Sequence, residues 1–121
     1  MLKTSEIIAP YAAELAVLDY KKYKNGDLNP DVYLDDIWGN KIETNWYGFS
    51  LDGIPMVWAY IIDKFLIQVA KETESDFKIL QIKRKFGGLR FHIGYDVDKF
   101  PEIRNEIREL EKALFSKDLI Y

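Results

Sequence analysis

The fold of this chain is decided by the stretch KILQIKRKFGGLRFHIGY, residues 78–95. Apolar residues alternate with basic or polar ones on both sides of Gly87-Gly88, which is the pattern of two half-buried strands. Two consecutive glycines favour a two-residue turn because both positions can adopt a positive φ. The stretch therefore predicts a β-hairpin with its turn at Gly87-Gly88.

A turn at that place determines which side chains share a face, because directly opposed residues of a hairpin lie on the same side. The predicted core face carries Leu80, Ile82, Phe86, Leu89, Phe91, Ile93 and Tyr95. The opposite face, which we expect to meet solvent or a ligand, carries Gln81, Lys83, Lys85, Arg90 and His92.

Arg84 is the one residue that breaks this alternation, since it falls on the core face opposite Phe91. It can stack on an aromatic ring, reach the rim of the core, or pair with a carboxylate. A buried arginine without a partner is costly. We therefore predict an acidic partner, with Asp63 as the candidate.

Helical patterns flank the hairpin. Residues 55–72 are apolar around most of the circumference, which predicts a central helix. Residues 5–24 predict a helix in which Pro10 causes a kink or begins the second part, and residues 31–38 predict a short helical turn. A narrow apolar stripe predicts a last helix after Pro101, and it consists of Ile103, Ile107, Leu110 and Leu114.

The predicted fold class is α+β. A lone hairpin is marginally stable, so we expect residues 41–47 to add a strand. The hairpin 78–95 and this strand would form a small antiparallel sheet packed against about three to four helices. The length of 121 residues fits a single domain, residues 1–121.

Composition narrows the function classes. The chain has no cysteine, which excludes a disulfide scaffold, a cysteine nucleophile and a thiolate metal site. The start lacks the pattern of a signal peptide, and the apolar stretch 55–70 contains Asp63 and Lys64 and is too short for a bilayer. We therefore expect a cytoplasmic protein with no membrane contact.

Charge is distributed unevenly along the chain. The net charge is −3, yet residues 77–95 contain five basic residues and no acid, so the rest of the chain carries −8. Residues 26–53 contain six acids and one base. Such asymmetry concerns partners and fields rather than fold. The two segments either neutralise each other within the domain or serve as separate binding surfaces.

Two surfaces are candidates for binding. Lys83, Lys85, Arg90 and His92 form a basic patch that is a solvated sheet face, a dock for an anionic protein, or a site for nucleic acid or a nucleotide. With Phe86 and Phe91 on the core face, the patch would lack aromatic rings for stacking bases. The second candidate surface for a partner is an acidic and aromatic segment, consisting of Asp31, Asp35, Asp36, Trp38, Trp46 and Tyr47. Core packing is the alternative explanation for its aromatic members.

Catalytic and metal signals are weak. His92 is the only histidine, and no serine stands in a nucleophile context, so an ordinary strand histidine is the favoured interpretation. Asp31 and Asp35 are four residues apart, but acids near a helix N-terminus also favour the helix dipole. We predict no catalytic residue, no metal and no cofactor.

The residues QIKRKFGGLRFH, 81–92, resemble a "QVKEKFGGLRFY"-like hairpin motif of short, uncharacterised bacterial and phage proteins. The order of central helix, hairpin and charged helix is similar over roughly residues 55–115. Several such proteins end in a paired-cysteine segment, whereas this chain has no cysteine, so no metal role carries over. The resemblance implies a bacterial or phage setting and no catalytic residue.

The function that we expect is that of a non-enzymatic protein-binding module, such as an immunity, inhibitor or regulatory partner. One alternative is nucleic-acid or nucleotide binding through the basic hairpin face, and another is a small enzyme that uses His92. A homodimer is also expected if the central helix keeps a bare flank around Met56, Tyr60 and Ile67.

Overall fold

The computed structural model describes residues 3–17 and 54–115, and these form helices and one small sheet. The elements in chain order are α1 (Thr4–Ile8), η1 (Ala9–Tyr11), α2 (Ala12–Val17), α5 (Met56–Thr73), β1 (Lys78–Lys85), β2 (Gly88–Gly94) and α6 (Pro101–Ala113). The two strands form a two-stranded antiparallel sheet, which confirms the α+β class. The short helix and the strand predicted at 31–38 and 41–47 lie outside the described residues.

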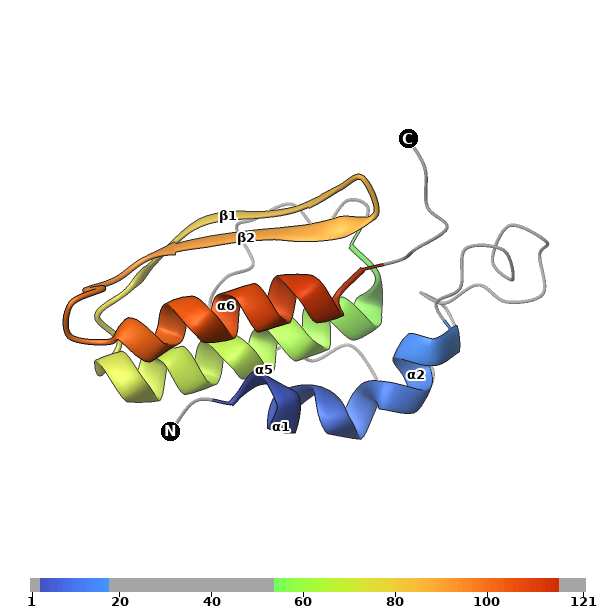
Figure 1. Cartoon of the computed structure of the whole chain (residues 1–121), viewed down its shortest axis with the longest axis horizontal. Helices are drawn as coiled ribbons and strands as arrows, with labels where there is room; N and C mark the ends of the chain where they lie inside the picture. The colour runs from blue at the N-terminus through green and yellow to red at the C-terminus, as the bar shows by residue number, and fades with distance from the viewer. Residues whose placement is uncertain (1–2, 18–53, 116–121) are drawn as a thin grey trace.

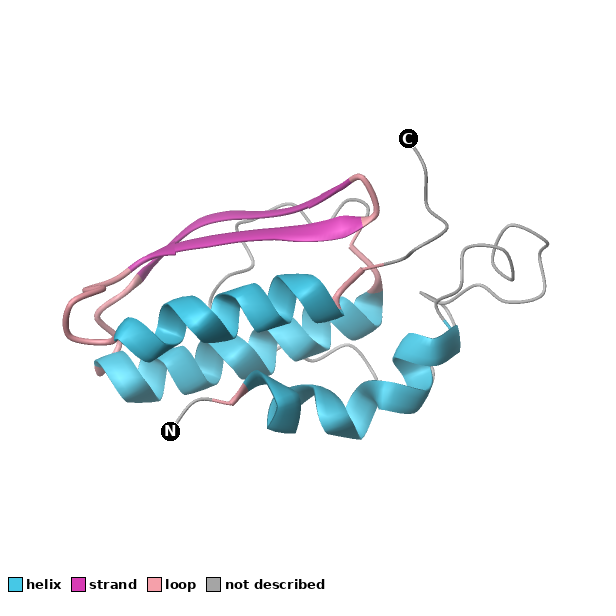
Figure 2. Ribbon diagram, viewed as in Figure 1, coloured by secondary structure: helices cyan, strands magenta, loops and turns pink. Residues whose placement is uncertain are grey.

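Three layers result (Figure 1). The hairpin covers one side of α5 and α6, and the N-terminal helical segment lies on the other side of these two helices (Figure 2). The N-terminal segment contacts α5 and α6, and α6 contacts β2. Each amphipathic element thus finds an apolar surface on a neighbour.

The N-terminal segment changes its helical form where the sequence predicts a kink. Pro10 lies in the 3₁₀ turn η1 between α1 and α2, because proline cannot supply the N–H that a continuous helix needs. Thr4 anchors the segment to α6. Its N–H donates to Glu106 Oε1 and its hydroxyl donates to the Glu106 carbonyl, both at 2.8 Å.

Helix α5 is central, as its composition predicts. Its fully buried members come from more than one face of the helix, namely Val57, Ile61, Ile62, Phe65, Leu66 and Val69. Phe65 makes an edge-on contact with Phe91 of β2, with ring centroids 5.6 Å apart. This contact ties the helix layer to the hairpin.

The dimer prediction requires an exposed flank of α5 around Met56, Tyr60 and Ile67, and one of these three residues is buried. Tyr60 is only 6% exposed within the single chain. The dimer itself stays a prediction, but Tyr60 does not offer it an exposed surface.

The hairpin turn differs from the prediction. Lys85 pairs with Gly88, so the two turn residues are Phe86 and Gly87 rather than Gly87 and Gly88. Both have positive φ, 53° and 80°, which is the type I′ pattern. The shift moves Phe86 out of the predicted core face, and its side chain is 59% exposed.

A β-bulge changes the pairing register near the other end of β1. The register shifts between Ile79 and Gln81, which leaves Leu80 as the extra residue. Leu80 is 62% exposed, while Ile79 pairs with Ile93 and packs against the core in its place. The prediction that Leu80 and Phe86 belong to the core is therefore wrong, whereas Ile82, Leu89, Phe91 and Ile93 are buried as predicted.

Helix α6 presents its predicted stripe to the core. Ile103, Leu110 and Leu114 are fully buried, and Ile107 packs partly buried beside them. Pro101 occupies its first turn, where a missing N–H costs nothing. No helix within the described part of the chain is long and apolar enough to cross a bilayer.

Candidate functional site

The polar side of the hairpin carries the predicted basic residues together. Lys83, Lys85, Arg90 and His92 are all exposed, and we call them the cationic face. The register sets Lys83 directly opposite Arg90, and Gln81 opposite His92. These residues lie on the side of the hairpin opposite its buried residues, as the alternation predicts, and their role in binding stays a prediction.

Like charges face each other across this ribbon. Directly opposed charges of one sign destabilise a sheet. Within residues 3–17 and 54–115, no ion pair offsets Lys83 or Arg90. Among the described residues the cationic face is a concentration of positive charge, and the pairing of Lys83 with Arg90 is unfavourable for the hairpin.

Phe86 stands at one end of the cationic face. The Lys85 ammonium lies 5.4 Å from the centroid of its ring. Because a non-glycine residue with positive φ is strained, the turn holds this exposed ring at an energetic cost. An aromatic ring is therefore available beside the basic residues, contrary to the expectation that Phe86 points into the core.

Arg84 contacts an aromatic ring on the other face of the hairpin. Its Cζ lies 5.2 Å from the centroid of the Trp58 ring of α5. The ring that it meets is thus on the central helix rather than Phe91. Asp63 is 1% exposed, but five residues along a helix place it roughly 140° round the axis from Trp58. The Arg84–Asp63 pair stays a prediction.

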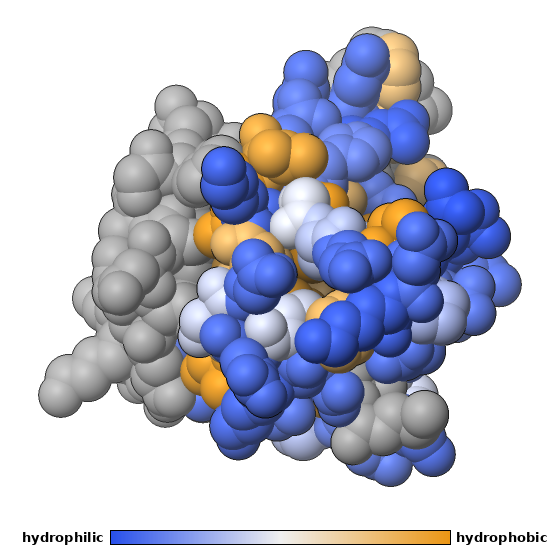
Figure 3. All heavy atoms as spheres, turned by 90° about the vertical axis from the view of Figure 1, so that its left-hand side faces the viewer, coloured by the Kyte–Doolittle hydropathy of each residue, from blue (hydrophilic) through white to orange (hydrophobic). Residues whose placement is uncertain are grey.

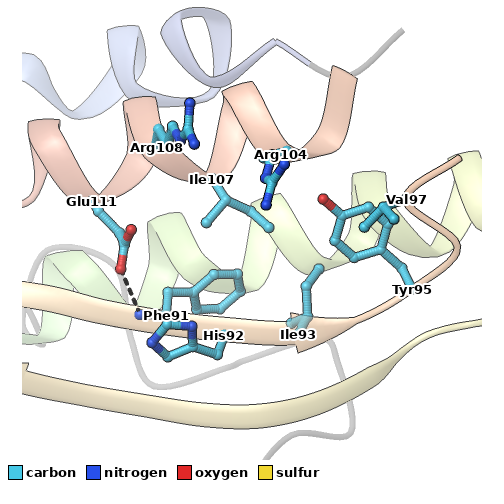
Figure 4. A pocket seen from close by; sticks show the side chains of 9 residues that line it. All are labelled: Phe91, His92, Ile93, Tyr95, Val97, Arg104, Ile107, Arg108 and Glu111. Carbon is cyan, nitrogen blue, oxygen red and sulfur yellow. Dashed lines mark hydrogen bonds between the residues drawn. The ribbon is translucent and has the colours of Figure 1, made fainter. Parts of the chain in front are cut away.

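A cleft of about 320 Å³ lies between β2 and α6 (Figure 4). Its lining residues are Phe91, His92, Ile93, Tyr95, Val97, Arg104, Ile107, Arg108 and Glu111. His92 belongs both to this lining and to the cationic face. The two surfaces are therefore continuous around the edge of β2.

The polar side chains of the cleft differ in the contacts that they make. Glu111 Oε2 accepts a hydrogen bond of 3.0 Å from the Phe91 N–H. Arg104 points from α6 toward the strand, beside the Tyr95 hydroxyl (Figure 4). Burial raises the pKa of Tyr95 above its usual 10.0, and the positive charge of Arg104 partly opposes that rise. Arg104 and Arg108 are both exposed and four residues apart on α6.

The end of the molecule where β2 leads into α6 is mainly hydrophilic. Figure 3 shows hydrophilic side chains over most of this face, with hydrophobic ones in separate patches. Val97, 50% exposed, belongs to the loop here and lines the cleft.

Among the described residues, no group of three histidine, aspartate or glutamate side chains could hold a metal ion.

The second predicted surface cannot be placed. Its residues lie outside the described part of the chain, and they are Asp31, Asp35, Asp36, Trp38, Trp46 and Tyr47.

Sequence reasoning missed Arg104 and Arg108, although their spacing of four residues on a predicted helix marks one helical face. Nothing in that spacing shows that this face lies beside β2.

Comparison with known proteins yields no relative. No protein family matches the chain, no curated protein is similar to it, and no solved structure matches its fold. The resemblance of residues 81–92 to a bacterial and phage hairpin motif therefore stays untested. Any function must therefore be inferred from the sequence and the described residues.

Proposed function

We propose that this chain is a non-enzymatic binding module that docks an acidic protein surface on the cationic face of its hairpin. The observation that carries the proposal is the exposed pairing of Lys83 with Arg90. Two like charges held side by side are unfavourable in the free protein, and an anionic partner would convert that cost into favourable contacts.

The overall charge favours a protein over a long polyanion. Outside residues 77–95 the chain carries −8, and a nucleic acid would meet that repulsion over an extended length. An acidic patch on a protein needs to match only the short ribbon. An immunity, inhibitor or regulatory role in the cytoplasm of a bacterium or of a phage-infected cell fits such a module.

The test uses a short polyglutamate peptide, comparable in length to the hairpin, as the acidic polypeptide and a DNA duplex as the competing polyanion, each titrated at several salt concentrations. The Lys83→Glu/Arg90→Glu variant reverses the central pair. We expect it to weaken binding of polyglutamate by about 30-fold, equivalent to about 1 kcal/mol for each reversed charge. The wild-type affinity should fall as salt rises.

A matched control is Lys3→Glu/Lys71→Glu. Both lysines are exposed, and the net charge changes by the same amount at positions off the hairpin. This control should keep most of the affinity. Equal loss in both variants, or binding indifferent to salt, would refute the proposed docking face.

Nucleic-acid binding is the second candidate, and the exposure of Phe86 favours it. A ring 59% exposed beside Lys85 could stack on a base of a single strand. Oligothymidylate should then bind more tightly than polyglutamate, and Phe86→Ala should weaken it by roughly tenfold, in line with the stacking energy of one base. If Phe86→Ala leaves oligothymidylate binding unchanged, this candidate fails.

The homodimer also remains a proposal. Sedimentation at micromolar concentration distinguishes a species near the chain mass of 14.2 kDa from one of twice that mass. The burial of Tyr60 within one chain favours the smaller species.

A further inference from the structure

The outer edge of β2 exposes hydrogen-bonding groups in a fixed alternation. In an antiparallel pair, every second residue directs its N–H and C=O away from the partner strand. The Leu89 N–H donates to the Leu114 carbonyl at 3.1 Å, and the Phe91 N–H donates to Glu111 Oε2. Both donors point away from β1. By the same alternation along β2 we expect the Ile93 N–H to face outward as well, and Ile93 lines the cleft.

The chain already pairs one residue with this edge. Gly88 forms an isolated antiparallel bridge with Phe115, just after α6 ends. Glu111 then caps the edge at Phe91. These contacts cover the turn-proximal part of β2, and beyond them the edge at Ile93 borders the cleft. The edge thus accepts both a backbone carbonyl, at Leu89, and a carboxylate, at Phe91.

The cleft combines an apolar floor with positive charge. Phe91, Ile93 and Ile107 supply apolar surface, and Arg104 and Arg108 supply two guanidinium groups. The single carboxylate in the lining is that of Glu111, which accepts the Phe91 N–H. A volume of about 320 Å³ is at the lower end for ligand sites and suits a short segment with small apolar side chains.

From this arrangement we infer that the cleft binds an extended acidic peptide segment, which adds to the edge of β2 at Ile93 and places a carboxylate at Arg104 and Arg108. The inference rests on the proposed function, because His92 joins the cleft to the cationic face and one acidic partner can occupy both. Main-chain hydrogen bonds to Ile93 provide affinity, and the arginines select acidic side chains.

The experiment uses the full chain and a synthetic heptapeptide of alternating valine and glutamate, acetylated and amidated so that its ends are uncharged. Amide chemical shifts report where it binds. We expect saturable shifts of the Ile93 amide that are larger than those of Lys83 or Arg90. A peptide with glutamine in place of glutamate should bind about tenfold more weakly, the loss of roughly one charge-assisted hydrogen bond.

A charge exchange tests the arginines. Arg104→Glu/Arg108→Glu should weaken the valine–glutamate peptide by at least about tenfold and strengthen a valine–lysine peptide of the same length. Both residues are exposed, so the fold should survive, and Arg104→Gln/Arg108→Gln provides a second, uncharged variant. Retention of full affinity by both variants would overturn the inference.

Two further arms separate the inference from its alternatives. Isovalerate supplies a carboxylate on an apolar body without a peptide backbone; if it shifts Ile93 with an affinity equal to that of the peptide, the site is one for small organic anions and strand addition is wrong. The Lys83→Glu/Arg90→Glu variant should bind polyglutamate about 30-fold more weakly but bind the heptapeptide within about threefold of wild type, because exposed charges off the cleft contribute little. Loss of polyglutamate binding in that variant, with no shift at Ile93 in the wild type, would refute this inference and leave the proposed function standing.

Discussion

Replacing Phe86 with asparagine should stabilise the protein slightly, although it removes a phenyl ring. Phe86 has a φ of 53°, and the left-handed conformation costs a residue with a side chain roughly 1–2 kcal/mol. Asparagine followed by glycine is the preferred pair for this turn, because asparagine tolerates that conformation. The change therefore relieves most of the strain.

The losses are smaller than this gain. The contact of the ring with the Lys85 ammonium is worth about 0.5 kcal/mol at an exposed site. A ring already 59% exposed forfeits roughly another 0.5 kcal/mol of burial. The expected net effect is about 0.5 kcal/mol of added stability, or an increase of about 2 °C in the melting temperature of a chain of this size.

The sign of the effect reports the hairpin register. If the turn were at Gly87-Gly88, Phe86 would be a core residue, and removing its ring would cost about 3–5 kcal/mol. Urea unfolding at 25 °C, followed by circular dichroism, separates these outcomes when the slope with urea is unchanged. Destabilisation by about 3 kcal/mol or more would refute the register.

Substitutions of the two glycines that follow Phe86 provide the control. Gly87 has a φ of 80°, so Gly87→Ala should destabilise by at least about 1 kcal/mol. Gly88 lies in β2 without a positive φ. The one tight contact of an added Cβ would be with the Phe115 ring, 3.1 Å away, on an exposed side chain that can shift, and the Lys85 carbonyl oxygen at 3.7 Å is at ordinary contact distance. Gly88→Ala should therefore stay within about 0.5 kcal/mol of wild type. Equal destabilisation by both changes would indicate the Gly87-Gly88 turn instead.

Two further predictions concern packing and the cleft. Leu110→Ala should lower the free energy of unfolding in urea by about 2–5 kcal/mol, because Leu110 is fully buried. Leu80→Ala should lower it by less than about 0.5 kcal/mol, because Leu80 is 62% exposed. Equal losses would contradict the bulge in β1. Arg104→Gln should raise the pKa of Tyr95 further, because it removes the charge that opposes the effect of burial, and the ¹³Cζ shift of Tyr95 through a pH titration measures it. Since the folded state holds the Tyr95 proton more tightly than the unfolded state does, the stability contributed by this group is present below pH 10.0 and is lost as pH rises through the folded pKa. An unchanged Tyr95 titration in Arg104→Gln would place Arg104 away from the cleft.

Local sequence patterns determined much of the architecture. Periodicity is a property of the chain itself, so the helices α5 and α6, the hairpin strands and the break at Pro10 could all be predicted from it. The four members of the cationic face were also predictable, since alternation along a strand decides which side chains lie opposite the core.

The tertiary structure decided the register and the cleft. Two neighbouring glycines allow either turn, and the sequence contains no local term that prefers Phe86 in a strained position. Pairing at the Phe86-Gly87 turn, together with the bulge at Leu80, places Ile79 and Ile82 on the core, and that gain comes from packing against α5 and α6. Arg104 and Arg108 became candidate binding residues only because α6 packs beside β2. That packing is a tertiary contact, which no local sequence pattern encodes.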